Sequence, residues 1–188
     1  MNDMPLRGKR VAILATDGVE ISEYVQPRAA VENAGAQVEL ISIKSGEIQG
    51  FHHLDKADRF PVDKLARDAD PNEYDALLLP GGVANPDRLR MDEDAVRFVR
   101  AFFTAHKPVG AICHAPWTMI DAQVVAGRTL TSWPSLRTDL VNAGAHWVDE
   151  ECHIEAGLVT SRGPQDLPTF CAKVVEEFAK GRQPAGVA

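Results

Sequence analysis

Short apolar runs alternate along this chain with segments of helical periodicity, and this alternation limits the folds that the chain can adopt. The runs that predict strands lie at residues 10–16, 37–43, 75–79, 107–112, around 154 and at 158–161. The segments that predict helices lie at residues 23–33, 92–106 and 167–178, and residues 45–62 predict a turn followed by a short hairpin. Strands and helices in units of this length predict an α/β fold, with a mostly parallel sheet covered by helices on both faces.

The length and charge of the chain narrow its class further. A chain of 188 residues fits one domain, with an expected core at about 9–179 and a disordered tail at 181–188. Its formal charge of −7 disfavours nucleic acid and anionic membranes as partners. The first apolar run, residues 11–15, is too short for a signal peptide or a membrane span. Three cysteines are too few for a disulfide scaffold, so a reducing cytoplasm is the expected compartment.

Three unusual segments follow three of the predicted strands. They are residues 17–20 (DGVE), 80–82 (PGG) and 113–114 (CH). In parallel α/β sheets, binding and catalytic sites form at the carboxyl ends of the strands. The three segments are therefore expected to converge on one site.

Cys113 has the sequence context of a catalytic nucleophile. It follows a buried strand directly, and Pro116 fits the first turn of a helix, so the thiol is expected at a tight strand-to-helix turn. This arrangement resembles a nucleophile elbow, and the helix N-terminus would favour the thiolate. A buried, inert cysteine is the commoner fate of a free thiol. The neighbouring His114 and the turn favour the catalytic interpretation.

The other two segments offer groups that could assist a thiol. His114 could act as a general acid or base, although adjacency in sequence alone is weak evidence. The backbone N–H groups of Gly81 and Gly82 could bind an oxyanion, although a Pro-Gly-Gly tripeptide is more often only a turn. Glu20 could share a proton with the sulfur if it points inward, since burial raises the pKa of a carboxyl group. A surface acid is the simpler interpretation of Glu20.

The remaining candidates are given structural roles. His52 and His53 lack the spacing of metal ligands, so neither a metal nor another cofactor is expected. Cys171 lies on the apolar face of the last helix and is expected in the core. Cys152 lies in a short predicted strand, and a redox role for it is open but unsupported.

Four motifs resemble those of the PfpI family of intracellular cysteine proteases and amidases. They are LPGG at residues 79–82, AICHAP at 111–116, NAGAHW at 142–147 and TSRGP at 160–164. The similarity extends from about residue 9 to 178. The family belongs to the ThiJ/PfpI superfamily, which is related to class I glutamine amidotransferases. The resemblance implies a flavodoxin-like three-layer sandwich with Cys113 at the elbow.

The resemblance also implies roles for individual residues. Glu20 would match the acid that hydrogen-bonds the thiol, and Gly82 with the His114 backbone would match the oxyanion hole. In protease members, an acid from a neighbouring subunit orients the histidine. The NPDRLR segment at residues 85–90 places Asp87 in that role, which implies a homo-oligomer between a dimer and a hexamer.

The chain departs from the family pattern near the site. The family more often has glutamate at the position of Asp87, so the shorter side chain would hold His114 less firmly. Ala115 stands where glycine is usual, and its methyl group would tighten the pocket. Trp117 and Trp133 are expected to line the mouth of the pocket, although core packing explains them almost as well.

Three functions remain open from the sequence. The first is hydrolysis of a peptide or amide through an acyl-enzyme on Cys113. The second is glyoxalase or protein deglycase chemistry, in which the same thiolate adds to a small aldehyde without glutathione. The third is a stress protein without enzymatic activity, in which Cys113 senses oxidation. The 85–90 motif favours hydrolysis, whereas Ala115 and the two tryptophans favour a small pocket.

Overall fold

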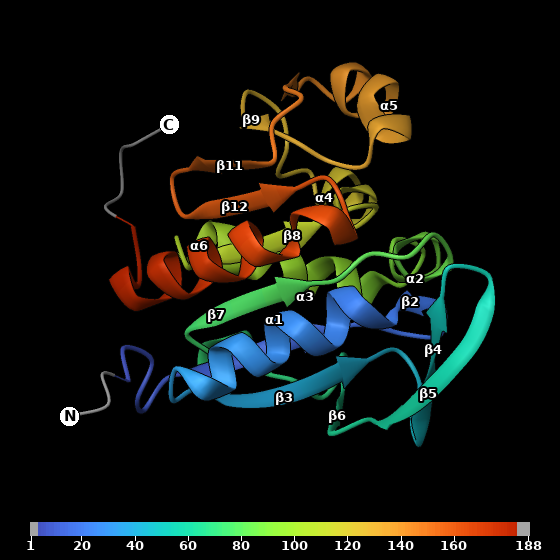
Figure 1. The fold of residues 1–188 in the computed structure, drawn as a ribbon, viewed down its shortest axis with the longest axis vertical. Helices are drawn as coiled ribbons and strands as arrows, with labels where there is room; N and C mark the ends of the chain where they lie inside the picture. The colour runs from blue at the N-terminus through green and yellow to red at the C-terminus, as the bar shows by residue number, and fades with distance from the viewer. Residues whose placement is uncertain (1–3, 184–188) are drawn as a thin grey trace.

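The computed structural model describes residues 4–183 and is built around a seven-stranded sheet (Figure 1). The strand order is β11-β12-β8-β7-β1-β3-β6. The strands of this sheet are β1 (Arg10–Leu14), β3 (Gln37–Ser42), β6 (Lys64–Leu65), β7 (Ala76–Leu79), β8 (Val109–Ile112), β11 (Cys152–Glu155) and β12 (Leu158–Ser161). All neighbouring strands run parallel except β11, which pairs antiparallel with β12. The predicted α/β fold is confirmed.

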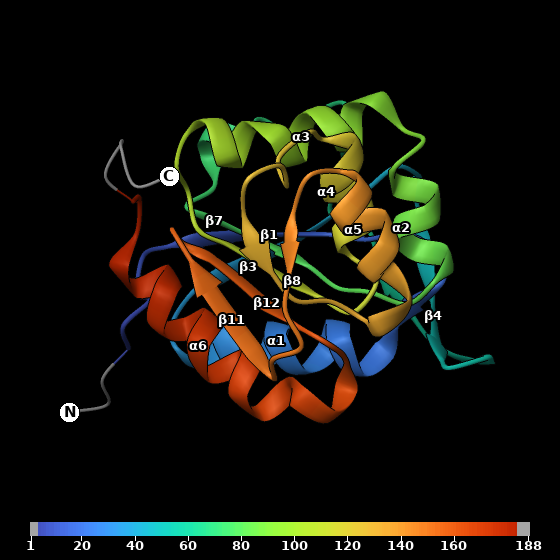
Figure 2. The same cartoon turned by 90° about the horizontal axis from the view of Figure 1, so that it is seen from above.

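Helices cover both faces of the sheet (Figure 2). They are α1 (Ile21–Asn33), α2 (Ala84–Leu89), α3 (Glu93–Thr104), α4 (Pro116–Asp121), α5 (Arg137–Asn142) and α6 (Leu167–Lys180). Helices α1 and α6 pack on one face, and α3 and α4 pack on the other. Each face has its own apolar core cluster, so the sheet is buried on both sides, as expected for parallel strands. None of the helices within residues 4–183 is long and apolar enough to span a membrane.

The amphipathic helix α3 shows how the sequence directs this packing. The side chain of Asp92 accepts a hydrogen bond from the N–H of Ala95 at 2.9 Å, which caps the first turn. Phe98, Val99 and Phe102 are buried against the sheet. Val96 and Phe103 are only partly buried and pack at the edge of this face.

The predicted hairpin at residues 45–62 forms a separate three-stranded sheet. Its strands are β2 (Val19–Glu20), β4 (Glu47–His52) and β5 (Asp55–Pro61), and β2 pairs with β4 directly after β1 ends. The tip of the hairpin consists of His53 and Leu54, and Leu54 is 94% exposed. This pairing brings the hairpin tip close to the carboxyl end of β1.

A small strand pair and the C-terminal segment lie outside the two larger sheets. Strands β9 (Thr129–Leu130) and β10 (His146–Trp147) form a small parallel pair near α5. The backbone N–H of Gln183 donates to the carbonyl oxygen of His106, so the start of the predicted disordered tail is held against the fold. Residues 184–188 of that predicted tail lie outside the described residues.

Candidate active site

Cys113 occupies the strand-to-helix turn that the sequence predicts. It follows β8 directly and has a φ angle of 63°, in the left-handed region. Its N–H donates to the carbonyl oxygen of Ser161 at 3.0 Å, and its own carbonyl oxygen accepts from the N–H of Trp133 at 2.9 Å. A left-handed conformation costs a non-glycine residue roughly 1–2 kcal/mol. The flanking hydrogen bonds hold Cys113 in this conformation, which is often found at functional sites.

The carboxyl group beside the sulfur belongs to Glu23, not to Glu20. Glu23 lies in the first turn of α1 and is buried against the sheet. Its Oε2 accepts a hydrogen bond from the N–H of Gly81 at 2.9 Å. Its Oε1 is buried without a nitrogen or oxygen partner among residues 4–183, so the thiol of Cys113 is the polar group left to it. The expectation for Glu20 is therefore corrected to the acid one helical turn further on.

Burial raises the pKa of Glu23 to about 8, although its contacts with the Cys113 thiol and the Gly81 N–H act in the opposite direction. A carboxyl group with this pKa is mostly protonated at neutral pH. It can therefore donate a hydrogen bond, which an ionised carboxylate cannot do.

Burial also raises the pKa of the Cys113 thiol, and the nearby Glu23 carboxylate raises it further. The N–H groups of Gly82 and His114 lower it, but less strongly. The short helix α4 therefore does not by itself produce the thiolate expected from the sequence. Glu23 raises the pKa of the Cys113 thiol, whereas contact with the thiol lowers the pKa of Glu23, so the two groups titrate as a coupled pair. When Glu23 is protonated, it no longer repels a negative sulfur.

His114 is the second group that contacts the sulfur. Its Nδ1 lies 3.1 Å from Sγ of Cys113, and its Nε2 lies 3.5 Å from Oγ of Ser135, at the limit of a hydrogen bond. Burial lowers the pKa of His114 to about 4. The imidazole is therefore neutral at neutral pH and has an unprotonated ring nitrogen.

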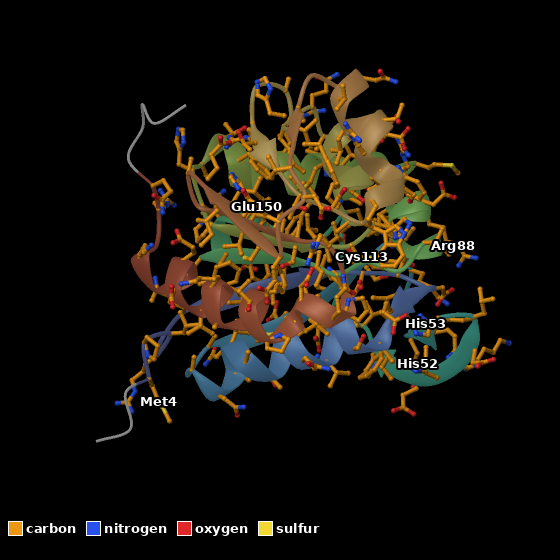
Figure 3. The ribbon with its side chains drawn as sticks, turned by 45° about the horizontal axis from the view of Figure 1, so that its top comes forward. Met4, His52, His53, Arg88, Cys113 and Glu150 are labelled. Atoms are coloured by element: carbon orange, nitrogen blue, oxygen red, sulfur yellow. The ribbon has the colours of Figure 1, made fainter. Side chains whose placement is uncertain are left out.

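Glu20 lies in the same cavity but is bound to the hairpin tip. Its Oε2 accepts the N–H of His53 at 2.9 Å, and its Oε1 accepts the hydroxyl of Ser22 at 3.2 Å. The imidazole of His52 lies 3.6 Å from Oε1. Figure 3 shows His52 and His53 on the same side of the molecule as Cys113. Glu20 thus holds the β4–β5 hairpin at the edge of the site.

The glycines after β7 have different roles. The N–H of Gly81 is used by Glu23, whereas the N–H of Gly82 lies near both the sulfur of Cys113 and the Glu23 carboxyl group. Gly82 has a φ angle of 80°, and a Cβ there would lie 2.3 Å from the carbonyl oxygen of Gly18. A Cβ at position 81 would lie 2.5 Å from Oε2 of Glu23. Side chains are therefore excluded at both positions, and of the two N–H groups only that of Gly82 is available for an oxyanion.

Asn85 fixes the relation between two of the loops. Its Oδ1 accepts the N–H of Thr16 at 2.7 Å, and its Nδ2 donates to the carbonyl oxygens of Pro80 and Gly81 at 2.9 and 3.1 Å. The residue is fully buried. It therefore ties the end of β1 to the loop that carries the two glycines.

The two tryptophans lie on different sides of His114. Trp133 lines the cavity and stacks on the imidazole at 5.9 Å between ring centroids. Trp117 packs edge-on against the same ring at 5.2 Å, but its Nε1 donates to Asp139 and the residue does not line the cavity. The expectation for Trp117 is corrected: it supports His114 from behind.

Asp87 is exposed on α2 and makes no hydrogen bond or ion pair to another residue in the described range 4–183. This chain alone does not bring Asp87 to His114. Its action from a neighbouring subunit stays a prediction.

The cavity over the sulfur is small. Its volume is about 280 Å³, whereas sites for drug-sized ligands are usually about 300–1,000 Å³. The lining residues are Glu20, Glu23, His53, Leu54, Gly82, Val83, Cys113, His114, Trp133 and Pro164. A buried thiol, a protonated carboxyl group and a neutral imidazole meet in this space. The arrangement can add sulfur to a carbonyl carbon and move protons on either side of the new bond.

Glu23 and Asn85 are the residues with site contacts that the sequence did not reveal. The signal for Glu23 was present, because two acids three residues apart follow β1 and either could face the sheet. The signal for Asn85 was its place in the 85–90 motif, which pointed only to Asp87.

Comparisons with known proteins agree on the fold. The sequence profile of the DJ-1/PfpI family matches residues 9–177. A Bacillus subtilis protein named "Putative cysteine protease YraA" is 42% identical over 163 residues, which is 86% of this chain and 94% of that protein. A Pyrococcus abyssi protein named as a deglycase is 39% identical over 171 residues, or 91% of this chain and 98% of that protein. The crystal structure of Drosophila melanogaster DJ-1beta aligns with a TM-score of 0.82 at 24% identity, covering 91% of this chain and 90% of that one.

Proposed function

Because the chain belongs to the DJ-1/PfpI family, we propose that it is a thiol enzyme for small 2-oxoaldehydes. The proposed substrates are compounds such as methylglyoxal and the adducts that they form with amines, and the products are 2-hydroxy acids. The deglycase name of the Pyrococcus abyssi relative supports this proposal. The related proteins leave peptide hydrolysis as a second candidate.

The observation that carries the proposal is the set of protonation states in the cavity. Hydrolysis of an amide needs an acid to protonate the leaving amine, and a cationic histidine usually supplies this proton. Here burial lowers the pKa of His114 to about 4, so the imidazole is neutral. The protonated group is Glu23, which lies beside the sulfur, where the oxygen of an attacked aldehyde would carry its negative charge. The small cavity also favours a small aldehyde over a peptide.

The proposed reaction begins when the thiolate of Cys113 adds to the aldehyde carbon of methylglyoxal. The C=O double bond becomes a single bond, and its oxygen takes the proton from Glu23, with the N–H of Gly82 stabilising the negative charge. The product of this step is a hemithioacetal. Its carbon still carries one hydrogen.

In the next steps, His114 takes that hydrogen as a proton, the electron pair forms a carbon–carbon double bond, and the former ketone oxygen becomes an enolate oxygen. The proton on His114 then returns to the adjacent carbon, and the hydroxyl proton of the sulfur-bearing carbon passes to the former ketone oxygen, which gives a thioester of a hydroxy acid. Water then cleaves the thioester, so that lactate leaves and Cys113 regains its thiol. The sum is methylglyoxal plus water to lactate, and no oxidant or reductant is required. On an amine adduct, sulfur replaces nitrogen at the same carbon, and the amine leaves with a proton.

The experiment that tests the function offers purified protein methylglyoxal and a fluorogenic peptide side by side. We expect lactate to form from methylglyoxal at a rate far above that of the Cys113→Ala variant, with little release of fluorophore from the peptide. Peptide cleavage that depends on Cys113, without lactate formation, would reverse the order of the two candidates.

The second candidate, hydrolysis, depends on an oligomer. In this proposal Asp87 of one subunit holds the His114 imidazole of another, which raises the basicity of the ring and supports proton transfer to a leaving amine. The exposure of Asp87 on α2 leaves it accessible to a neighbouring copy.

A mixing experiment tests the role of Asp87. We expect Asp87→Ala to lower peptidase turnover by about 10²-fold, because the ring loses its orienting carboxylate. Mixing the weakly active Asp87→Ala subunits with inactive Cys113→Ala subunits should raise the activity above that of either alone, since some hybrid sites combine an intact Asp87 with an intact Cys113. Wild-type kinetics in Asp87→Ala, or a fully active monomer at high dilution, would contradict this role.

The oxidation-sensor interpretation would be favoured if the His114 imidazole, the acid–base group of both enzymatic reactions, were turned away from the sulfur. Its Nδ1 lies 3.1 Å from Sγ, so that condition is not met. We therefore favour an enzyme.

A further inference from the structure

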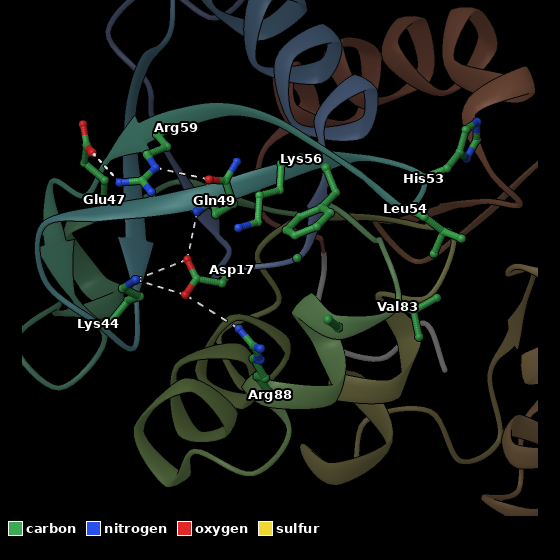
Figure 4. A pocket seen from close by; sticks show the side chains of 13 residues that line it. Asp17, Lys44, Glu47, Gln49, His53, Leu54, Lys56, Arg59, Val83 and Arg88 are labelled. Carbon is green, nitrogen blue, oxygen red and sulfur yellow. Dashed lines mark hydrogen bonds and ion pairs between the residues drawn. The ribbon is translucent and has the colours of Figure 1, made fainter.

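A second cavity adjoins the catalytic one and differs from it in character (Figure 4). Its volume is about 500 Å³, and the two cavities share His53, Leu54 and Val83 as lining residues. The second cavity lies between the β4–β5 hairpin and α2. A molecule bound at Cys113 can therefore extend across the hairpin tip into this space.

The second cavity is lined by an excess of positive charge. Its cationic side chains are those of Lys44, Lys56, Arg59 and Arg88, against the two carboxylates of Asp17 and Glu47. This excess of two charges is opposite in sign to the formal charge of −7 for the whole chain. Cavities lined by one sign of charge concentrate ligands of the other sign.

Asp17 positions two of these cations without neutralising the cavity. Lys44 lies 3.0 Å from Oδ2 of Asp17, and Arg88 lies 3.6 Å from the same oxygen. Burial raises the pKa of Asp17, but the N–H of Gln49 and the two cations lower it by a larger amount. The pKa is therefore below its usual value, and the group stays ionised. The single carboxylate thus contacts one cation from the segment after β3, Lys44, and one from α2, Arg88.

The other two cations, Arg59 and Lys56, have fewer or longer contacts with acidic groups. Arg59 donates to the side-chain oxygen of Gln49 at 3.1 Å, and its distance to Glu47 is 3.9 Å. The side chain of Lys56 forms neither a hydrogen bond nor an ion pair with any other residue between 4 and 183, although it lines the cavity. Lys56 is therefore available to a ligand.

We propose that this cavity binds a phosphate monoester, and that the preferred substrates are 2-oxoaldehydes that carry a phosphate at the end remote from the reacting carbonyl. A phosphate offers two negative charges and three acceptor oxygens, which suits several cations around one space. The substrate part of this inference depends on the proposed function, whereas the phosphate site does not.

The test compares matched substrate pairs of two lengths. They are hydroxypyruvaldehyde and its phosphate, with three carbons, and 3-deoxyglucosone and its 6-phosphate, with six. We expect the phosphate ester of at least one pair to have a kcat/KM about tenfold above that of its uncharged partner, the factor supplied by one charge-assisted hydrogen bond. The Lys56→Glu variant should remove this preference, and Lys56→Arg should keep it.

The matched control is Arg97→Glu, which reverses a charge on the exposed face of α3, outside both cavities. This variant should leave kcat/KM unchanged for both substrates of each pair. If Arg97→Glu removes the preference for the phosphate ester as Lys56→Glu does, the effect comes from the net charge of the protein, and the phosphate site is refuted.

Binding of glycerol 3-phosphate, which has no carbonyl group, separates this inference from the proposed function. If the protein consumes methylglyoxal but neither prefers a phosphate ester nor binds glycerol 3-phosphate in calorimetry, the phosphate site is refuted and the function stands. If it does not consume methylglyoxal but binds glycerol 3-phosphate, and Lys56→Glu abolishes that binding, the site stands and the proposed function fails.

Discussion

Replacing Cys113 with alanine is expected to lower the rate of lactate formation from methylglyoxal by about 10⁴-fold or more. The thiol is the attacking group in both candidate reactions, and neither His114 nor Glu23 can form the covalent intermediate in its place. The measurement is kcat/KM at pH 7 with protein free of trace wild type.

The fold should survive this change. Alanine meets the same backbone conformation at φ 63° that cysteine adopts, and the smaller side chain removes a buried polar group. The far-ultraviolet circular dichroism spectrum and the unfolding midpoint of Cys113→Ala serve as the control. Activity within a few fold of wild type, in a folded variant, would remove Cys113 from the mechanism.

Replacing Glu23 with glutamine is expected to lower turnover by about 10²- to 10⁴-fold, the usual contribution of a positioned acid or base. Glutamine can still accept the N–H of Gly81 but cannot exchange a proton with the sulfur. Glutamine also removes the carboxylate that raises the pKa of the Cys113 thiol. The midpoint of thiol alkylation against pH should therefore move to lower pH, although turnover falls because the acid is lost.

The pH profile of activity gives an independent measure. Burial raises the pKa of Glu23 to about 8, so the protonated form that donates to the substrate oxygen is present below pH 8 and is lost above it. Wild-type activity should fall as the pH rises through about 8, and this limb should be absent in Glu23→Gln. Glu20→Gln is the matched control, because Glu20 lines the same cavity but is bonded to the hairpin tip. If the alkylation profile shifts in Glu20→Gln and not in Glu23→Gln, then Glu20 is the acid that controls the protonation of Cys113.

The strands of the central sheet could be predicted because they are continuous apolar runs. Parallel strands buried on both faces leave this signature, and the runs at residues 75–79 and 107–112 include β7 and β8 in full. The elbow at Cys113 could be predicted because a buried strand precedes it and Pro116, which fits the first turn of a helix, follows it. The elements that were missed are short. Helices α2 and α5 have six residues each, which is less than two turns and too few for a periodic pattern.

The acid at the sulfur could not be assigned from the sequence because α1 lacks an apolar stripe. Its buried face consists of Glu23, Tyr24, Pro27 and Val31, so burial on this helix does not follow hydrophobicity. Nothing in the sequence shows which side of such a helix meets the sheet. The prediction therefore named Glu20, whereas the carboxyl group on the N–H of Gly81 belongs to Glu23.

The reactive pair is assembled from neighbouring strands that are distant in the sequence. Glu23 follows β1, Gly81 follows β7 and Cys113 follows β8, and β7 lies between the other two strands in the sheet. Each pairing closes a long stretch of chain, so these contacts form late compared with local helices. Before they form, Cys113 is an ordinary thiol with a pKa of about 8.5, and Glu23 is an ordinary carboxylate. A newly made or partly unfolded chain therefore carries no tuned nucleophile, and its reactivity begins only when the sheet has closed.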